Sequence, residues 1–279
     1  MPGPDPHTED RQANVPDPAP PAWGGGTRAR RRPRLAPVLG LLALWVFVSS
    51  LALLPGHAGG LGFAPIPQAL AALLLLTCIA VFRWSDAGLG RPQPGSWRLM
   101  WLPWLYLPLF AAVIWALGPP PTGALITLTA LMIWVALSEE VMFRGLLFPA
   151  LRQHLRIWPA IWVTTLAFAA IHLGNGLITG DYPGAVVQSL AAVSTGLLLL
   201  AVRLRRGSIR PAILYHLLWN VGAFGLDLAE QTQGAPVVAQ AGPVLLLVPL
   251  ALVVPNGLYA LWLLRDAGRV RLPGDPGGV

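Results

Sequence analysis

Residues 99–138 read LMWLPWLYLPLFAAVIWALGPPPTGALITLTALMIWVALS and contain no Asp, Glu, Lys or Arg. A helix needs roughly 20 apolar residues to cross the hydrocarbon of a bilayer, so this stretch is long enough for two crossings. Residues 35–80 form a second stretch without these charged residues, and it too is long enough for two crossings. The two stretches predict an all-α, polytopic membrane protein.

The composition of the whole chain agrees with a membrane protein and argues against an ordinary soluble domain. Hydrophobic residues make up 55% of the 279 residues and charged residues only 11%, far from the usual globular proportions. The net charge of +7 could indicate nucleic-acid binding, but the arginines are scattered over short loops instead of forming one face. We therefore expect the lipid bilayer as a partner and no nucleic acid.

Clusters of Gly, Pro and charged residues divide the chain into about eight transmembrane helices. The helices are predicted near residues 36–54, 64–82, 99–117, 123–148, 158–173, 184–202, 209–227 and 242–264. Arginine occurs in every second connection between them, as the positive-inside rule requires of cytoplasmic loops. These connections and the final tail carry Arg83, Arg91, Arg98, Arg152, Arg156, Arg203, Arg205, Arg206, Arg210, Arg265, Arg269 and Arg271. The alternation predicts a multi-pass protein of the cell membrane with both termini in the cytoplasm.

The fourth predicted helix carries SEEVMFRG (residues 138–145) at or just inside its cytoplasmic edge. A charge near the centre of a membrane helix costs roughly 2.5–3.5 kcal/mol, so pairing and a function must offset the cost. Glu140 and Arg144 are four residues apart and share a helix face, where they can pair. Glu139 is rotated from that face by about 100° and stays free to act as a general base. The alternative is that both acids extend to the membrane surface beside the arginines of the next loop.

Two later helices carry most of the other polar groups inside the spans. His172 lies in the fifth helix, and His216 and Asn220 share a face of the seventh, four residues apart. A single helix histidine is often only a packing residue. A base, two histidines and an amide together, however, are the parts needed to hydrolyse an acyl group with activated water. Ser138 and Cys78 are poorer candidates for a covalent nucleophile, because neither has a suitable base nearby.

The membrane domain is predicted to span residues 35–265, with its catalytic core at about 123–227. Residues 1–34 are rich in Pro and Arg and cannot bury a core, so we predict a disordered cytoplasmic tail there. Residues 266–279 are predicted to form a short cytoplasmic tail.

Three runs, EEVMFRG (139–145), FAAIH (168–172) and GSIRPAILYHLLWN (207–220), resemble a known family. It is the family of type II CAAX prenyl endopeptidases and their bacterial relatives, the CPBP or Abi intramembrane proteases. Its three motifs, EExxxR, FxxxH and HxxxN, occur here in order on three separate helices. The resemblance implies an eight-helix fold with a cavity open toward the cytoplasmic side. It also implies a hydrolase that cleaves a peptide bond in a membrane-anchored or lipidated substrate.

The resemblance implies roles for the motif residues as well. They are water activation by Glu139 and His172, oxyanion stabilisation by His216 and Asn220, and positioning of the first carboxylate by Glu140 and Arg144.

A divalent metal such as zinc is a possible cofactor, because members of the family are commonly called metalloproteases. Glu139, His172 and His216 could hold zinc if a metal is bound. The chain lacks HExxH, and the family's fold also supports a metal-free glutamate mechanism. We prefer the metal-free mechanism because the amide of Asn220 is a poor zinc ligand.

Two other functions compete with proteolysis. A transporter or proton-conducting protein would also place Glu, His and Arg inside the membrane. Transporters usually contain paired repeats, whereas the polar residues here fall only in the second half of the chain. A non-catalytic immunity or assembly protein of the same fold is expected to lose a motif residue, and none is lost.

Overall fold

The computed structural model describes residues 32–51, 65–232 and 248–269, and within these ranges all regular structure is helical. The predicted all-α class is therefore confirmed. The predicted tail over 1–34 lies almost entirely outside the described residues, as does most of the tail over 266–279. The elements are α1 (Leu35–Ser50), α2 (Pro65–Phe82), η2 (Ser96–Met100), α3 (Trp101–Trp104), α4 (Tyr106–Leu117), α5 (Thr122–Glu140), η3 (Val141–Leu147), α6 (Phe148–Leu151), α7 (Ile157–His172), α8 (Asn175–Thr179), α9 (Tyr182–Arg206), α10 (Arg210–Thr232), α12 (Val248–Leu264) and η5 (Ala267–Arg269).

Each of the eight predicted helices overlaps an apolar helical stretch of the structure. Six stretches are long and apolar enough to cross a membrane, whereas α1 and α12 are apolar but shorter within the described residues. The predicted third helix is divided into η2, α3 and α4. The break between α3 and α4 has a local cause, because Pro108 has no N–H group to bond the carbonyl of Trp104, where α3 ends. The chain is a multi-pass membrane protein.

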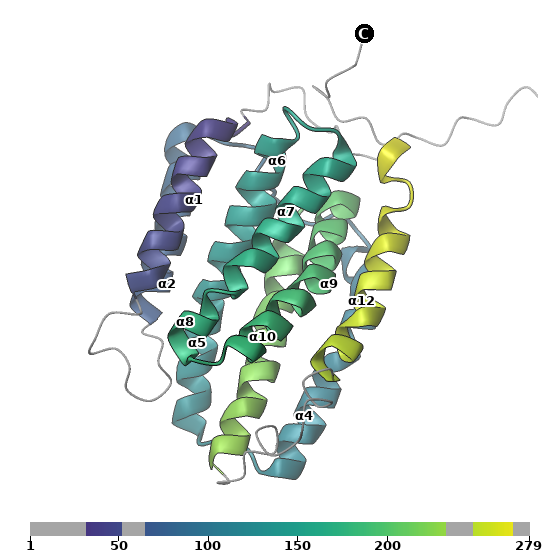
Figure 1. Cartoon of the computed structure of the whole chain (residues 1–279). Coiled ribbons are helices and arrows are strands. Elements are labelled where there is room, and N and C mark those ends of the chain that lie inside the picture. Colours follow the sequence, from purple (N-terminus) through teal and green to yellow (C-terminus); the bar gives the residue numbers. More distant parts are fainter. Residues whose placement is uncertain (1–31, 52–64, 233–247, 270–279) are drawn as a thin grey trace, which may run out of the picture.

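The helices form one bundle in which α9 is the central element (Figure 1). It packs mainly against α12 and α7, while α5 packs against α10 and α2. The residues of α9 from Leu197 to Val202 are all buried, and so is every residue of η3. The core therefore lies between α9 and the segment that carries the EExxxR motif.

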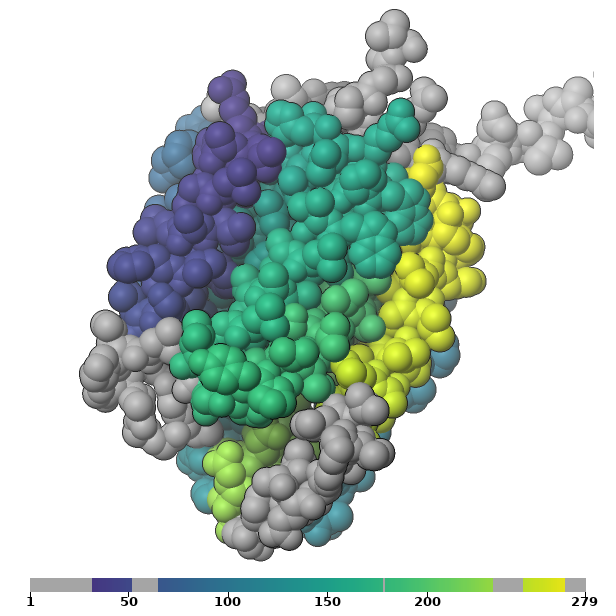
Figure 2. All heavy atoms as spheres, in the orientation of Figure 1, coloured from purple at the N-terminus to yellow at the C-terminus, as the bar shows by residue number. Residues whose placement is uncertain are grey.

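The outer face of the bundle is apolar. Figure 2 shows α1 and α12 on opposite sides of one face, with α7 between them. Large apolar side chains are exposed on all three helices, among them Leu44, Phe47, Trp162, Leu166, Leu258 and Trp262. An exposed apolar surface of this extent is typical of contact with lipid.

The arginine-rich connections meet at one end of the bundle. Arg203 Nη2 donates to the carbonyl of Asp86 (2.8 Å), and Arg205 forms an ion pair with Asp266 (3.5 Å). The beginning of α1 and the end of α12 lie at this same end (Figure 1). This arrangement is what the alternation of arginines requires. The cytoplasmic location of this end stays a prediction.

Candidate active site

The EExxxR motif lies at a change of helix type. α5 ends at Glu140 and continues as the π-helix η3, which contains Arg144. π-Helical turns are rare and frequently occur at functional sites. Both glutamates lie about three helical turns before Leu151, the end of α6. They are therefore deeper in the bundle than the edge position predicted from the sequence.

Glu140 and Arg144 form the predicted pair. Arg144 Nη1 donates to Glu140 Oε1 (2.8 Å), and the two side chains are 1% and 0% exposed, respectively. Arg144 Nη2 also donates to the carbonyl of Gly196 on α9 (3.2 Å), and its guanidinium lies 4.1 Å from the centre of the Phe168 ring. Glycine at position 196 allows this close approach, because a Cβ atom there would lie 3.1 Å from Cδ1 of Phe168 and 3.4 Å from Arg144 Nη2. The alternative that the glutamates extend to the membrane surface is wrong.

His216 connects α10 to both glutamates. Its Nδ1 lies 2.9 Å from Glu140 Oε1, and its Nε2 lies 3.7 Å from Glu139 Oε2. Glu140 Oε1 therefore contacts both Arg144 and His216. Glu139 is different, because its Oε2 is buried and has no hydrogen-bond partner among the described residues. The adjacent carboxylates thus have different surroundings, as the helical geometry of the motif predicted.

His172 lies at the last residue of α7, and its orientation is fixed within its own helix. Its Nδ1 is 2.8 Å from the carbonyl of Phe168. A carbonyl can only accept, so Nδ1 carries the proton and the Nε2 of neutral His172 is an acceptor. The Phe168 ring lies 4.8 Å from the His172 ring and 5.9 Å from the His216 ring. Phe168 thus contributes packing contacts to both histidines and to Arg144.

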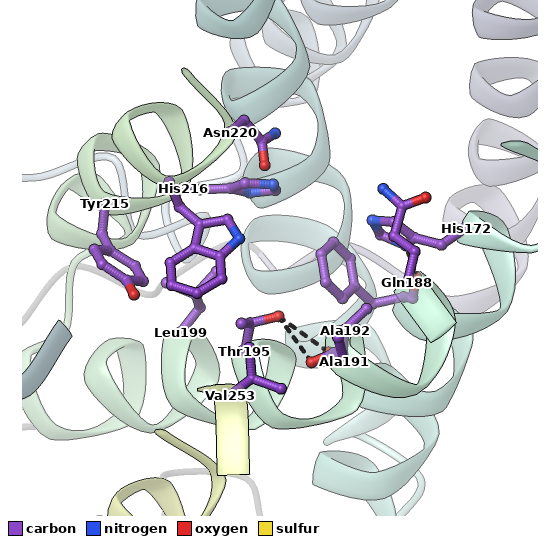
Figure 3. A pocket seen from close by; sticks show the side chains of 12 residues that line it. His172, Gln188, Ala191, Ala192, Thr195, Leu199, Tyr215, His216, Asn220 and Val253 are labelled. Atoms are coloured by element: carbon purple, nitrogen blue, oxygen red, sulfur yellow. Dashed lines mark hydrogen bonds between the residues drawn. The ribbon is translucent and has the colours of Figure 1, made fainter. Parts of the chain in front are cut away.

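Two pockets, called lobes below, open beside these residues. The α9–α12 lobe is lined by α7, α9, α10 and α12, and the α2–α5 lobe is lined by α2, α5, α7, α8, α9 and α10. They contain about 490 Å³ and 560 Å³ of empty space, counted out to their open sides. His172, Gln188 and Asn220 line both lobes, so the two lobes adjoin at these three side chains. Figure 3 shows the three side chains in the α9–α12 lobe.

The six predicted residues divide into two groups around these lobes. Glu139 lines the α2–α5 lobe, His216 lines the α9–α12 lobe, and His172 and Asn220 line both. Glu140 and Arg144 are not among the described lining residues. Glu140 contacts His216 and Arg144 contacts Phe168, and these two side chains line the α9–α12 lobe. The fold therefore brings together residues from α5, α7 and α10 that are far apart in the sequence.

Residues 121–222 match the family model of the type II CAAX prenyl endopeptidase Rce1-like proteins. This segment is similar to an Rce1-like domain. It extends from the beginning of α5 into α10 and contains all three motifs, so the resemblance predicted from the motifs is confirmed. No curated protein and no solved structure matches the chain.

Three polar residues of the Rce1-like domain were missed by the sequence reasoning. Gln188 and Thr195 of α9 line the cavity, and Asn175 of α8 donates from Nδ2 to Gln188 Oε1 (2.7 Å). They belong to none of the three motifs. One signal could have indicated Gln188, because an amide in an otherwise apolar membrane span needs a partner inside the bundle.

The candidate residues do not fit a zinc ion. Among the described residues, no three His, Cys, Asp or Glu side chains are placed to hold one metal ion. The set of Glu139, His172 and His216 is therefore unsuited to a shared metal, and the mechanism proposed below uses none.

Proposed function

We propose that the protein is an intramembrane endopeptidase of the cell membrane. It hydrolyses a peptide bond in a membrane-anchored or lipidated substrate with water activated by Glu139 and His172. One observation carries the proposal. Glu139 Oε2 is buried without a hydrogen-bond partner among the described residues, and Glu139 lines the same lobe as His172 and Asn220.

The proposed reaction has two proton transfers. Glu139 accepts a proton from the water molecule as the water oxygen attacks the carbonyl carbon, while His172 Nε2 accepts a hydrogen bond that orients the water. The tetrahedral oxyanion accepts hydrogen bonds from Asn220 Nδ2 and from His216, which donates from Nε2 as an imidazolium. The proton held by Glu139 then passes to the leaving amine as the C–N bond breaks.

Glu140 and Arg144 have a positioning role in this proposal. Glu140 accepts hydrogen bonds from Arg144 and His216, so it is already engaged and is a poor candidate for the base. Arg144 connects α5 and η3 to α9 through the carbonyl of Gly196. Together they hold Glu139 and His216 at fixed positions in the walls of the two lobes.

Transport is the main competing function, and the match to an Rce1-like family favours peptide hydrolysis over it. The test uses protein reconstituted in nanodiscs with a library of membrane-anchored peptides, and mass spectrometry to identify the products. We expect Glu139→Ala and His172→Ala to lower the cleavage rate at least about 100-fold, as is usual for loss of a general base. Glu230→Ala, which removes a carboxylate far along α10, is the control. Equal products from the wild type and both site variants would contradict the proposal.

A further inference from the structure

Gln188 lines both lobes and therefore marks their junction. Figure 3 shows it beside His172 in the α9–α12 lobe. Its Oε1 already accepts a hydrogen bond from Asn175 Nδ2. The side-chain amide therefore has a fixed orientation, and its Nε2 group, with two N–H donors, is left for another acceptor. A half-buried donor next to the proposed water site is placed to bind a substrate carbonyl.

The walls on both sides of Gln188 are mainly apolar. The α9–α12 lobe includes Ala192, Leu199 and Val253, and the α2–α5 lobe includes Leu131 and Met132. No Arg or Lys is among the described residues that line either lobe. A substrate carboxylate in the α2–α5 lobe would meet the Glu139 side chain and no Arg or Lys, and burial of an unpaired charge is strongly unfavourable.

The arrangement matches the geometry of an extended peptide. Successive side chains of an extended segment point to opposite sides, while its carbonyl groups stay available for hydrogen bonds. A segment that crosses the junction at Gln188 can place one side chain in each lobe. Its carbonyl groups then lie beside Gln188, His172 and Asn220.

We propose that Gln188 binds a backbone carbonyl next to the cleaved bond, and that the substrate is an extended, uncharged apolar peptide segment with one side chain in each lobe. The location of the cleaved bond rests on the proposed function. The binding of an apolar segment at Gln188 rests on the lining of the two lobes and on the Asn175–Gln188 hydrogen bond.

The test compares two variants that separate donation by Gln188 from its bond with Asn175. Gln188→Glu has the same shape and still accepts from Asn175, but it has no donor. Asn175→Ala removes the fixing bond and leaves the donor in place. Gln188→Met is the uncharged second variant, to be used if Gln188→Glu has a lowered thermal midpoint. Ser189→Ala is the matched control, because Ser189 bonds the carbonyl of Ala169 and does not line either lobe.

The probe is an acetylated, amidated fluorescent peptide made of Leu, Val and Ala, and its partner has one central Leu replaced by Asp. Binding is measured by fluorescence anisotropy in the Glu139→Gln background, and cleavage in the wild-type background. We expect Gln188→Met to raise Kd and KM about three- to tenfold, the range for loss of one neutral hydrogen bond. Gln188→Glu, which also adds a charge, should raise them at least as much. The value of kcat should change less than twofold. Ser189→Ala should change Kd less than twofold, and Asn175→Ala should raise Kd by less than Gln188→Glu does. The Asp peptide should bind at least about tenfold more weakly.

The outcomes separate this inference from the proposed function. Glu139-dependent cleavage with an unchanged KM in both Gln188 variants would overturn the role of Gln188 and leave the protease function intact. An effect of Asn175→Ala as large as that of Gln188→Glu would assign Gln188 a merely structural role. Tight binding of the Asp peptide would overturn the substrate class. Binding that depends on Gln188 without any cleavage would support the peptide site and contradict the proposed function.

Discussion

At the scale of single residues, the two neighbouring glutamates show how the bundle separates two roles. The Glu140 side chain is fully buried against Arg144 and His216, whereas the Glu139 side chain is 13% exposed and lines the cavity. The spacing of four residues predicted the first pair, because that contact is local to one helix. The contact between His216 and Glu140 could not be predicted, because it depends on how α10 packs against α5.

The Glu140–Arg144 pair should be essential for stability. Arg144→Met would leave the buried Glu140 with His216 as its only hydrogen-bonding partner among the described side chains. Removal of one member of a buried ion pair typically costs about 3–5 kcal/mol of the free energy of unfolding. We therefore expect a clearly lower thermal midpoint, measured by tryptophan fluorescence in detergent. The control is Arg98→Met, which removes an exposed arginine, and equal midpoints for the two variants would contradict the structural role of Arg144.

At the scale of helices, most boundaries could be predicted because charged residues and prolines mark the ends of apolar runs. The π-helix η3 could not be predicted, because its sequence VMFRGLL has no feature that separates it from an α-helix. The contribution of α9 to the site was also missed. Gln188 faces the cavity and Gly196 contacts Arg144. Both contacts depend on the way α9 crosses the bundle.

The contact between α4 and α10 depends on a glycine. A Cβ atom at Gly222 would lie 2.5 Å from Cδ2 and 2.8 Å from Cγ of Phe110, which is too close without a shift of the ring. Overpacking of this kind costs about 1–3 kcal/mol, so we expect Gly222→Ala to lower the thermal midpoint. Gly123→Ala is the matched control, because it is also helical and its Cβ would meet nothing within 4 Å. Its midpoint should stay equal or rise, since Ala favours helix by about 1 kcal/mol over Gly. Equal midpoints for the two variants would contradict the close packing at Gly222.

At the scale of the whole molecule, the arginine-rich connections form one end of the bundle and the acidic residues of late α10 lie toward the other. Alternation of arginine predicted the first feature, because loops on the same side of a membrane share their charge bias. The two lobes could not be predicted, because their walls come from seven helices that meet only in the folded bundle.

The orientation in the membrane has a direct test. We expect a green fluorescent protein fused after Arg206 to fluoresce and an alkaline phosphatase fused there to be inactive, because that loop should face the cytoplasm. The same two reporters fused after Glu230 should give the opposite pattern. A cytoplasmic pattern at both positions would contradict the predicted topology.

The most direct test of the account compares the wild type with Glu139→Gln, which keeps the size of the side chain and removes the proposed base. The measurement is kcat/KM for a cleaved membrane-anchored peptide, with the thermal midpoint determined on the same samples. The account predicts a loss of at least about 100-fold with an unchanged midpoint. A Glu139→Gln protein that cleaves the peptide as fast as the wild type would contradict it.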